Sequence, residues 1–98
     1  MKIGVSNSAF NDLETVIDYY AQEGVPDIGR QFAENIIEHI QVLSDHPDMG
    51  RVVPEFQSND IREIIHGPFR VVYLREEKSI TVIRVWRSER LLVLPHDT

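Results

Sequence analysis

The sequence has no cysteine among its 98 residues, which excludes a disulfide framework, a thiolate metal site and a cysteine nucleophile. It contains only five glycines and five prolines beside 42% hydrophobic residues, a balance that excludes a disordered or collagen-like chain. No apolar run approaches the roughly 18 residues that a membrane-spanning helix needs. The first ten residues lack the apolar block of a signal peptide, so we expect a cytoplasmic protein. A chain of this length is expected to form a single domain over residues 1–98.

Standard catalytic signatures are absent as well. The chain has no phosphate-binding loop, paired-histidine zinc motif, nucleophile elbow or glycine-rich dinucleotide turn. Its four histidines, His39, His46, His66 and His96, are scattered over the sequence, and none has a partner at metal-ligand spacing. His46 is expected at a helix end and His66 in an exposed turn, placements that need no function. We therefore expect no metal, no cofactor and no catalytic residue.

Negative charge predominates, with a formal net charge of −6, but it is unevenly distributed. Residues 1–48 contain two basic and nine acidic side chains, whereas residues 49–98 contain eight basic and seven acidic ones. The acidic total argues against a nucleic-acid-binding protein, because such proteins usually present a basic surface. Seven of the eight basic residues in the second half are arginines, whose guanidinium groups are suited to carboxylates and phosphates.

The hydrophobic pattern of the first half predicts a short edge strand followed by a helical hairpin. Residues 2–6 alternate as in a strand, and apolar residues then recur at helical spacing in two segments. Ser8 and Asp27 are the expected N-caps, while Gly24, Pro26 and Pro47 mark the helix ends. The expected buried stripes are Phe10, Leu13, Ile17 and Tyr20 in the first helix, and Phe32, Ile36, Ile40 and Leu43, flanked by Ala33 and Ile37, in the second.

The second half predicts strands. Residues 61–65 are a candidate strand, and residues 69–75 and 80–87 are rich in valine, isoleucine and aromatics. The polar loop 76–79 makes the last two strands antiparallel neighbours. The expected order is β-α-α-β-β-β, an α+β fold with a helical hairpin packed on one face of a small, mainly antiparallel sheet. Residues 91–94 form either a further strand or an apolar segment that a partner covers.

Arginines interrupt the two most apolar strands, Arg70 in one and Arg84 in the next. Depending on register, antiparallel pairing places both on one face of the sheet. One interpretation is a solvated face on which these arginines pair with Glu55 or Glu63. The other, which we favour for Arg70 and Arg84 together, is a binding face, because the helices already cover the opposite side.

Trp86 is the only tryptophan and lies at the end of its strand. It shares a face with Arg84, whereas Arg87 lies on the other face with Val85. Trp86 either closes the edge of the core, which we favour, or anchors a protein interface.

Three segments follow one another in a specific order: Pro47-x-x-Gly-Arg-x-Val-Pro-Glu55, Ile61-Arg-Glu63 and Phe69-Arg-Val-Val-Tyr73. With the helical positions before them and the strand 82–86 after them, they resemble the RelE/ParE superfamily of type II toxin–antitoxin toxins. The resemblance extends from about residue 8 to residue 92, and it implies the same α+β fold.

The RelE branch of this superfamily consists of ribosome-dependent mRNA endonucleases, which share sheet lysines and arginines and a C-terminal tyrosine. Arg70 matches the third-strand arginine, and Arg62 stands near a second-strand lysine position. The remaining groups are missing: Ser88 occupies the expected position of the fourth-strand arginine, and no tyrosine follows Tyr73. Phosphodiester cleavage needs charge stabilisation and proton transfer, so we expect no ribonuclease activity.

The ParE branch resembles the chain better. Its characterised members poison DNA gyrase and are neutralised by a ParD-type antitoxin that wraps the toxin. The resemblance implies that neighbours on the sheet support Arg70 and that the stretch from Arg84 onward contributes to target inhibition. A sheet face with Arg62, Arg70, Arg84 and Arg87 would suit an acidic antitoxin segment. The candidate antitoxin- or target-binding residues are Arg62, Arg70, Arg84, Trp86, Arg87, Arg90, Leu91 and Leu92.

Three hypotheses result. The favoured one is a ParE-like toxin without enzymatic activity, whose partners are an antitoxin and DNA gyrase, with no membrane and no sequence-specific nucleic acid bound by the toxin alone. The second is a RelE-like ribonuclease that uses Arg70, Arg84 and His66 or His96. The third is a non-toxic relative that only binds a partner.

Overall fold

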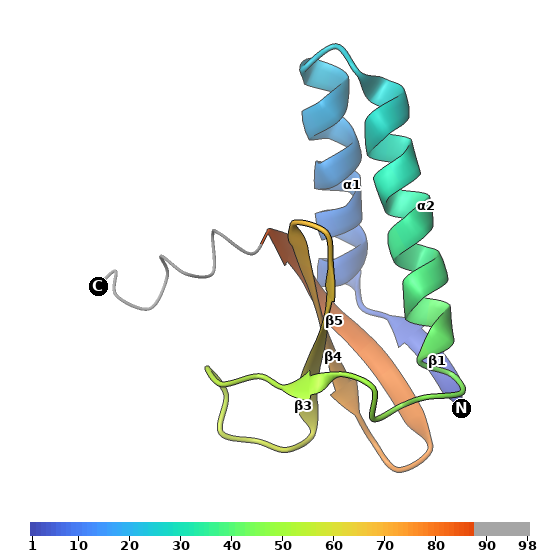
Figure 1. Cartoon of the computed structure of the whole chain (residues 1–98), viewed down its shortest axis with the longest axis vertical. Helices are drawn as coiled ribbons and strands as arrows, with labels where there is room; N and C mark the ends of the chain where they lie inside the picture. The colour runs from blue at the N-terminus through green and yellow to red at the C-terminus, as the bar shows by residue number, and fades with distance from the viewer. Residues whose placement is uncertain (88–98) are drawn as a thin grey trace.

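The computed structural model describes residues 1–87, so the expectations for Arg90 and for residues 91–94 lie outside the described residues. Two helices form a hairpin against one face of a five-stranded sheet (Figure 1), which confirms the predicted α+β fold. Within residues 1–87, neither helix is long and apolar enough to cross a membrane. The elements are β1 (Lys2–Val5), α1 (Asn7–Gln22), α2 (Pro26–Val42), β2 (Arg51–Val52), β3 (Ile61–His66), β4 (Phe69–Arg75) and β5 (Ser79–Arg87).

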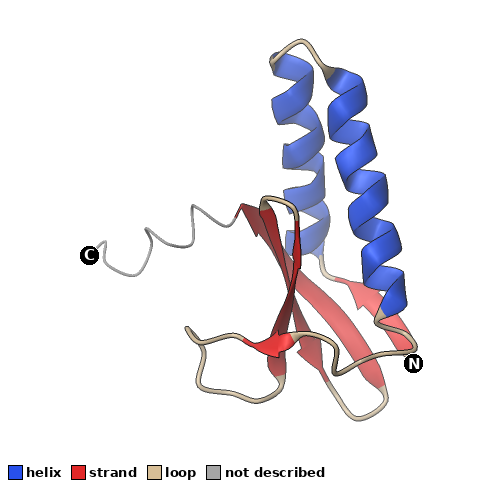
Figure 2. Cartoon of the chain, viewed as in Figure 1, coloured by secondary structure: helices blue, strands red, loops and turns tan. Residues whose placement is uncertain are grey.

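The sheet has the strand order β1-β5-β4-β3-β2 and is mixed (Figure 2). The pair β1–β5 is parallel, and the other three pairs are antiparallel. The pattern of the sequence did not predict β2, because a strand of two residues is too short to show alternation. A register shift between Val72 and Tyr73 marks an irregularity in the β4–β5 pairing.

The first helix begins two residues earlier than its sequence predicts. Ser6, not Ser8, is the N-cap, and its hydroxyl accepts a hydrogen bond from the Ala9 amide at 3.1 Å. The Ser6 amide also donates to the carbonyl of Val82, so the sheet fixes where α1 starts. At the other end, Gly24 has φ 82°, a left-handed conformation suited to glycine after a helix.

The second helix has no side-chain cap. Its N-cap is Val25, and Pro26 occupies the first turn, where a missing amide hydrogen costs nothing. Asp27, expected as the cap, lies inside the first turn and pairs with Arg30 instead. Its negative charge still interacts favourably with the positive end of the helix dipole.

The helices bury one stripe each against β3, β4 and β5. In α1 the buried positions are Ala9, Leu13 and Val16, so the prediction that Phe10 is buried is wrong: its side chain is 56% exposed. In α2, Ile37 is likewise exposed, because the stripe through Ile36 and Ile40 turns it outward. The core cluster is Ala9, Leu13, Val16, Ile36, Ile40, Leu43, Ile64, Phe69, Val71, Tyr73, Ile80, Val82 and Val85.

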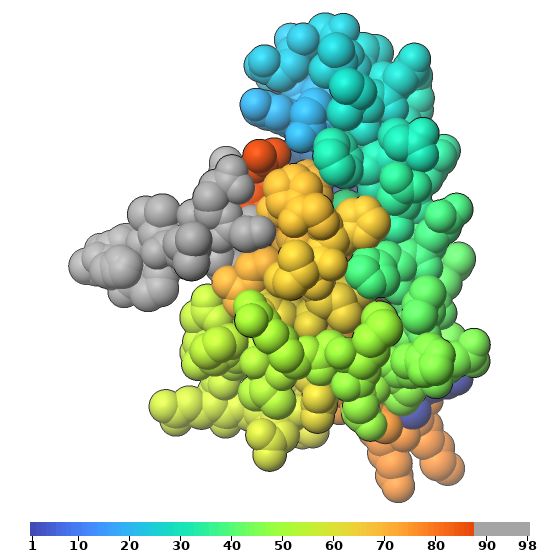
Figure 3. All heavy atoms as spheres, in the orientation of Figure 1, coloured from blue at the N-terminus to red at the C-terminus, as the bar shows by residue number. Residues whose placement is uncertain are grey.

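Aromatic rings connect the hairpin to the sheet. Tyr20 stacks on Phe32 at a centroid distance of 5.4 Å, and Phe32 meets Phe69 edge to face at 5.4 Å. Beyond this contact, the tip of the hairpin stands clear of the sheet (Figures 1 and 3).

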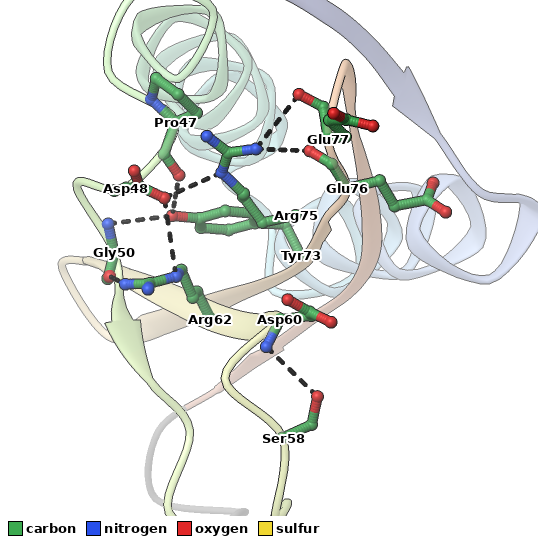
Figure 4. A network of polar contacts seen from close by, with 10 residues as sticks. All are labelled: Pro47, Asp48, Gly50, Ser58, Asp60, Arg62, Tyr73, Arg75, Glu76 and Glu77. Atoms are coloured by element: carbon green, nitrogen blue, oxygen red, sulfur yellow. Dashed lines mark hydrogen bonds and ion pairs between the residues drawn. The ribbon is translucent and has the colours of Figure 1, made fainter.

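A buried tyrosine hydroxyl holds the turn that follows α2 (Figure 4). Tyr73 Oη donates to the carbonyl of Pro47 at 2.9 Å and accepts from the amide of Gly50 at 2.9 Å. Burial raises the pKa of Tyr73, so the hydroxyl stays protonated. A Cβ added at Gly50 would lie 2.6 Å from Tyr73 Oη and 2.6 Å from the carbonyl oxygen of Glu63. Only glycine therefore fits between the turn and the sheet.

We expect Gly50→Ala to lower the free energy of unfolding by roughly 1–3 kcal/mol, because the new methyl group overlaps backbone and a fixed ring. Urea denaturation measures the loss. Gly4→Ala is the matched control, because nothing lies within 4 Å of its added Cβ. Equal stabilities of the two variants would contradict the close approach at Gly50.

Candidate functional site

The strand register divides the predicted arginines between the two faces of the sheet. Arg70 lies opposite Trp86 and Val72 lies opposite Arg84, so Arg70, Arg84 and Trp86 share the face turned away from the helices. This face is called the outer face below. Arg62 lies opposite the core residue Tyr73, which places it on the helix side. The expectation that Arg62 shares a face with Arg70 and Arg84 is therefore wrong. Arg87 lies on the helix side with Val85, as strand alternation predicted, and so does not belong to a common face with Arg70 and Arg84.

Arg70 is the centre of a charged cluster on the outer face and is buried, with only 6% of its surface exposed. Its Nε donates to Glu63 Oε1 at 2.5 Å, and its two terminal nitrogens donate to the two carboxylate oxygens of Glu55 at 3.0 Å each. The second oxygen of Glu63 accepts from Arg51 Nε at 2.6 Å. The result is a continuous chain of alternating charges, Arg51–Glu63–Arg70–Glu55.

The electrostatics of the cluster favour the ionised form of Glu55. The hydrogen bond from Arg70 is the main reason that the pKa of Glu55 is lowered, and the same bond raises the pKa of Arg70. The Glu63 side chain has no exposed surface, and a buried carboxylate is tolerated only when charges and hydrogen bonds compensate it. The pairing of Arg70 with Glu55 or Glu63, which belonged to the interpretation that we did not favour, is observed with both carboxylates.

Arg84 lies in the part of β5 that extends beyond the end of its neighbour β1. Its Nε and one terminal nitrogen donate to Asp12 of α1 at 2.8 and 3.1 Å, and the Val85 amide donates to the same carboxylate at 2.8 Å. Asp12 thus satisfies a backbone donor that an unpaired strand edge would leave free. The Arg84 side chain remains 41% exposed, so it is accessible to a partner.

Trp86 does not belong to the core cluster, in contrast to the interpretation that we favoured. It is half-buried on the outer face, and the Arg84 guanidinium lies 4.6 Å from the centroid of its ring. Ile65, opposite Arg70 on β3, is 47% exposed on the same face. Ile65, Arg84 and Trp86 therefore form an accessible apolar and cationic surface around the buried Arg70.

The remaining predicted arginines have structural partners. Arg62 donates to the carbonyl of Gly50 at 2.9 Å, and its Nε lies 3.9 Å from Asp48 Oδ1 (Figure 4). Arg87 lies on the helix side, where its guanidinium is 5.6 Å from the Phe69 ring centroid and 3.4 Å from Tyr20 Oη. The predicted site residues Arg90, Leu91 and Leu92 lie outside the described residues.

The sequence pattern missed a contact between two histidines. His39 of α2 and His66 at the end of β3 approach with their Nδ1 atoms 3.0 Å apart. Burial, and secondarily the neighbouring His66, lower the pKa of His39. The two residues are 27 positions apart, and only the packing of α2 on the sheet brings them together.

Comparisons with known proteins agree with this architecture. A family model described as "ParE toxin of type II toxin-antitoxin system, parDE" matches residues 3–92. The chain is similar in structure to the chromosomal ParDE system of P. aeruginosa, with a TM-score of 0.75, 21% identity and coverage of 89% of this chain and 95% of that chain. It is also similar to a conserved hypothetical protein from Helicobacter pylori, with a TM-score of 0.50, 14% identity and coverage of 91% and 96%. No curated protein matched the chain.

The helical hairpin on a five-stranded sheet is the fold that this chain shares with a protein of the chromosomal ParDE system of P. aeruginosa, and the family model describes a type II toxin. Because the family model matches most of its length, the chain belongs to the ParE toxin family of type II toxin–antitoxin systems. A toxin of such a system has an antitoxin as its partner.

We expect Glu63→Gln to lower the free energy of unfolding by roughly 3–5 kcal/mol, because it leaves Arg51 and the buried Arg70 facing a neutral amide. Urea denaturation of the purified variant measures the effect. Glu34→Gln, at an exposed position of α2, should change stability by no more than about 0.5 kcal/mol. A Glu63→Gln variant as stable as this control would contradict the role assigned to the cluster.

Stability should fall in mild acid because of His39. Its pKa is lowered from the ordinary value of 6.5 in the folded protein, so the unfolded chain binds the proton at a higher pH than the folded chain. The stabilisation is therefore complete above pH 6.5 and is lost as the pH falls toward the folded pKa. Urea midpoints at pH 7.5 and 5.5 should differ less for His39→Gln than for wild type, while the exposed-site variant His46→Gln should behave as wild type. Identical pH dependence in all three would be the opposing result.

Proposed function

We propose that this chain inhibits DNA gyrase by binding it, blocks replication, and is neutralised by a ParD-type antitoxin. Membership of the ParE family supports the proposal, because the characterised members of that branch act in this way. The observation that carries it within this chain is the state of Arg70. Three nitrogens of its guanidinium are already bonded to carboxylate oxygens.

The engagement of Arg70 argues against RNA cleavage. A ribonuclease of the RelE type needs a cation at the scissile phosphate and groups that transfer protons. Arg70 is the residue that matches the nuclease pattern, yet Glu55 and Glu63 neutralise it and would repel a phosphate placed beside it. A toxin with this arrangement acts through a binding surface and not through an active site.

The accessible part of the outer face is the best candidate for antitoxin binding. Arg84 offers a partly exposed guanidinium, and Trp86 and Ile65 offer apolar surface at either side of Arg70. An amphipathic acidic segment could bury its apolar side chains on Ile65 and Trp86 while a carboxylate pairs with Arg84. The buried Arg70 would then hold the strands that carry this surface in place through its ion pairs with Glu55 and Glu63.

Induction of the toxin in cells tests the proposed activity. We expect filamentation, DNA-damage signalling and loss of negative supercoiling, because a poisoned gyrase leaves broken and relaxed DNA. Rapid arrest of translation with cleaved mRNA would contradict the proposal in favour of a nuclease. Normal growth with abundant folded toxin would favour the non-toxic relative.

A matched pair of isoleucines tests the antitoxin surface. Ile65 on the outer face is 47% exposed and Ile37 on α2 is 44% exposed, so glutamate substitutions introduce the same charge at equal exposure. We expect Ile65→Glu to weaken binding of the cognate antitoxin at least about tenfold, a change of about 1.4 kcal/mol, by repelling its acidic groups. Ile37→Glu should leave the dissociation constant, measured by calorimetry, unchanged. Equal losses would count against the outer face.

A further inference from the structure

The contact between His39 and His66 joins the last third of α2 to the end of β3. Their Nδ1 atoms are 3.0 Å apart, their ring centroids are 5.2 Å apart, and the ring planes are inclined by 57°. Both residues are half-buried. Among residues 1–87, neither ring has another hydrogen-bond partner. The two nitrogens are therefore available to each other and to a ligand that enters from solvent.

This separation matches that of two ligands of one metal ion. Imidazole nitrogens bind late transition metals at 2.0–2.1 Å, so two of them lie about 2.9 Å apart at a right angle around the metal and about 3.4 Å apart at a tetrahedral angle. The observed 3.0 Å falls inside this interval. The ring centroids are 5.2 Å apart, which is the separation expected at a tetrahedral angle (about 5.2 Å) and not at a right angle (about 4.5 Å). A metal ion would thus need only small changes in the two side-chain torsions.

The protonation state also suits a metal. Ligating histidines must be neutral, and the contact of the two Nδ1 atoms at 3.0 Å requires that at least one of them carries no hydrogen. Without metal, one Nδ1 carries the hydrogen that the other accepts. On metal binding, this hydrogen moves to Nε2 of the same ring through solvent, so that both Nδ1 lone pairs face the ion and no net proton is released.

We propose that His39 and His66 form a binding site for a divalent late transition-metal ion, with Zn²⁺ as the best-fitting probe. Within residues 1–87, no three histidine, aspartate or glutamate side chains are placed so that they could hold one metal ion, so water or an external ligand fills the remaining coordination positions. Because the ligands come from α2 and β3, the site exists only in the folded chain. A bound metal ion therefore connects the helical hairpin to the sheet and stabilises the folded state.

Thermal unfolding at pH 7.5 with and without ZnCl₂ tests the proposal. We expect the Tm to rise by about 4–8 °C when Zn²⁺ is about fivefold above its dissociation constant. His39→Gln and His66→Gln should each abolish the rise, while His46→Gln, which removes an exposed histidine outside the pair, should retain it. A rise of the same size in all three variants would overturn the site, as would no rise in wild type.

A direct measurement keeps the proposal testable if either variant fails to fold. In the wild-type chain, titration with diamagnetic Zn²⁺ should shift the ¹⁵N resonances of the Nδ1 atoms of His39 and His66 together, and leave those of His46 unchanged. Shifts confined to the other histidines would contradict the proposal. Neither measurement involves gyrase or an antitoxin, so its outcome is independent of the proposed toxin activity.

Discussion

The ion pair between Glu63 and Arg70 is the interaction on which the outer face depends. Glu63 of β3 has no exposed side-chain surface and is compensated by Arg70 from β4 and Arg51 from β2. Two buried charges of this kind contribute little net stability, but removal of one leaves the other buried without a compensating charge. The pair therefore fixes β2 and the segment that carries Glu55 against the sheet. The same bonds occupy the guanidinium that a nuclease of this superfamily would direct at phosphate.

The net charge of −6 is distributed so that acidic residues of the helical half pair with arginines of the sheet half. Asp12 in the acidic helical half does not repel the sheet but caps the edge of β5 and orients Arg84. Within the described part of this arginine-rich half, Arg84 is partly exposed beside the apolar surfaces of Ile65 and Trp86, and Arg51 is exposed as well. A small cationic surface with apolar flanks is better suited to an acidic protein segment than to a polynucleotide.

The helical hairpin and the three longer strands could be predicted, because periodicity and alternation are local properties of the chain. The shared face of Arg70 and Arg84 depended on the register between β4 and β5, which no local pattern fixes. The cap at Ser6 could not be predicted, because hydrogen bonds to β5 select it over Ser8. The burial of Trp86 was misjudged for a similar reason, since a strand pattern does not reveal which face the helices cover. The approach of His39 to His66 depends on how α2 is set on the sheet, and no spacing in the sequence encodes it. The assignment of the outer face to antitoxin binding stays a prediction.

The central claim is that this ParE-family chain acts through binding and has no phosphodiesterase chemistry. The most direct test adds the purified chain to DNA gyrase with relaxed plasmid and, in parallel, to translating ribosomes with defined mRNA. The account predicts that supercoiling decreases in proportion to toxin concentration while the mRNA stays intact. Cleaved mRNA together with undiminished supercoiling would contradict it.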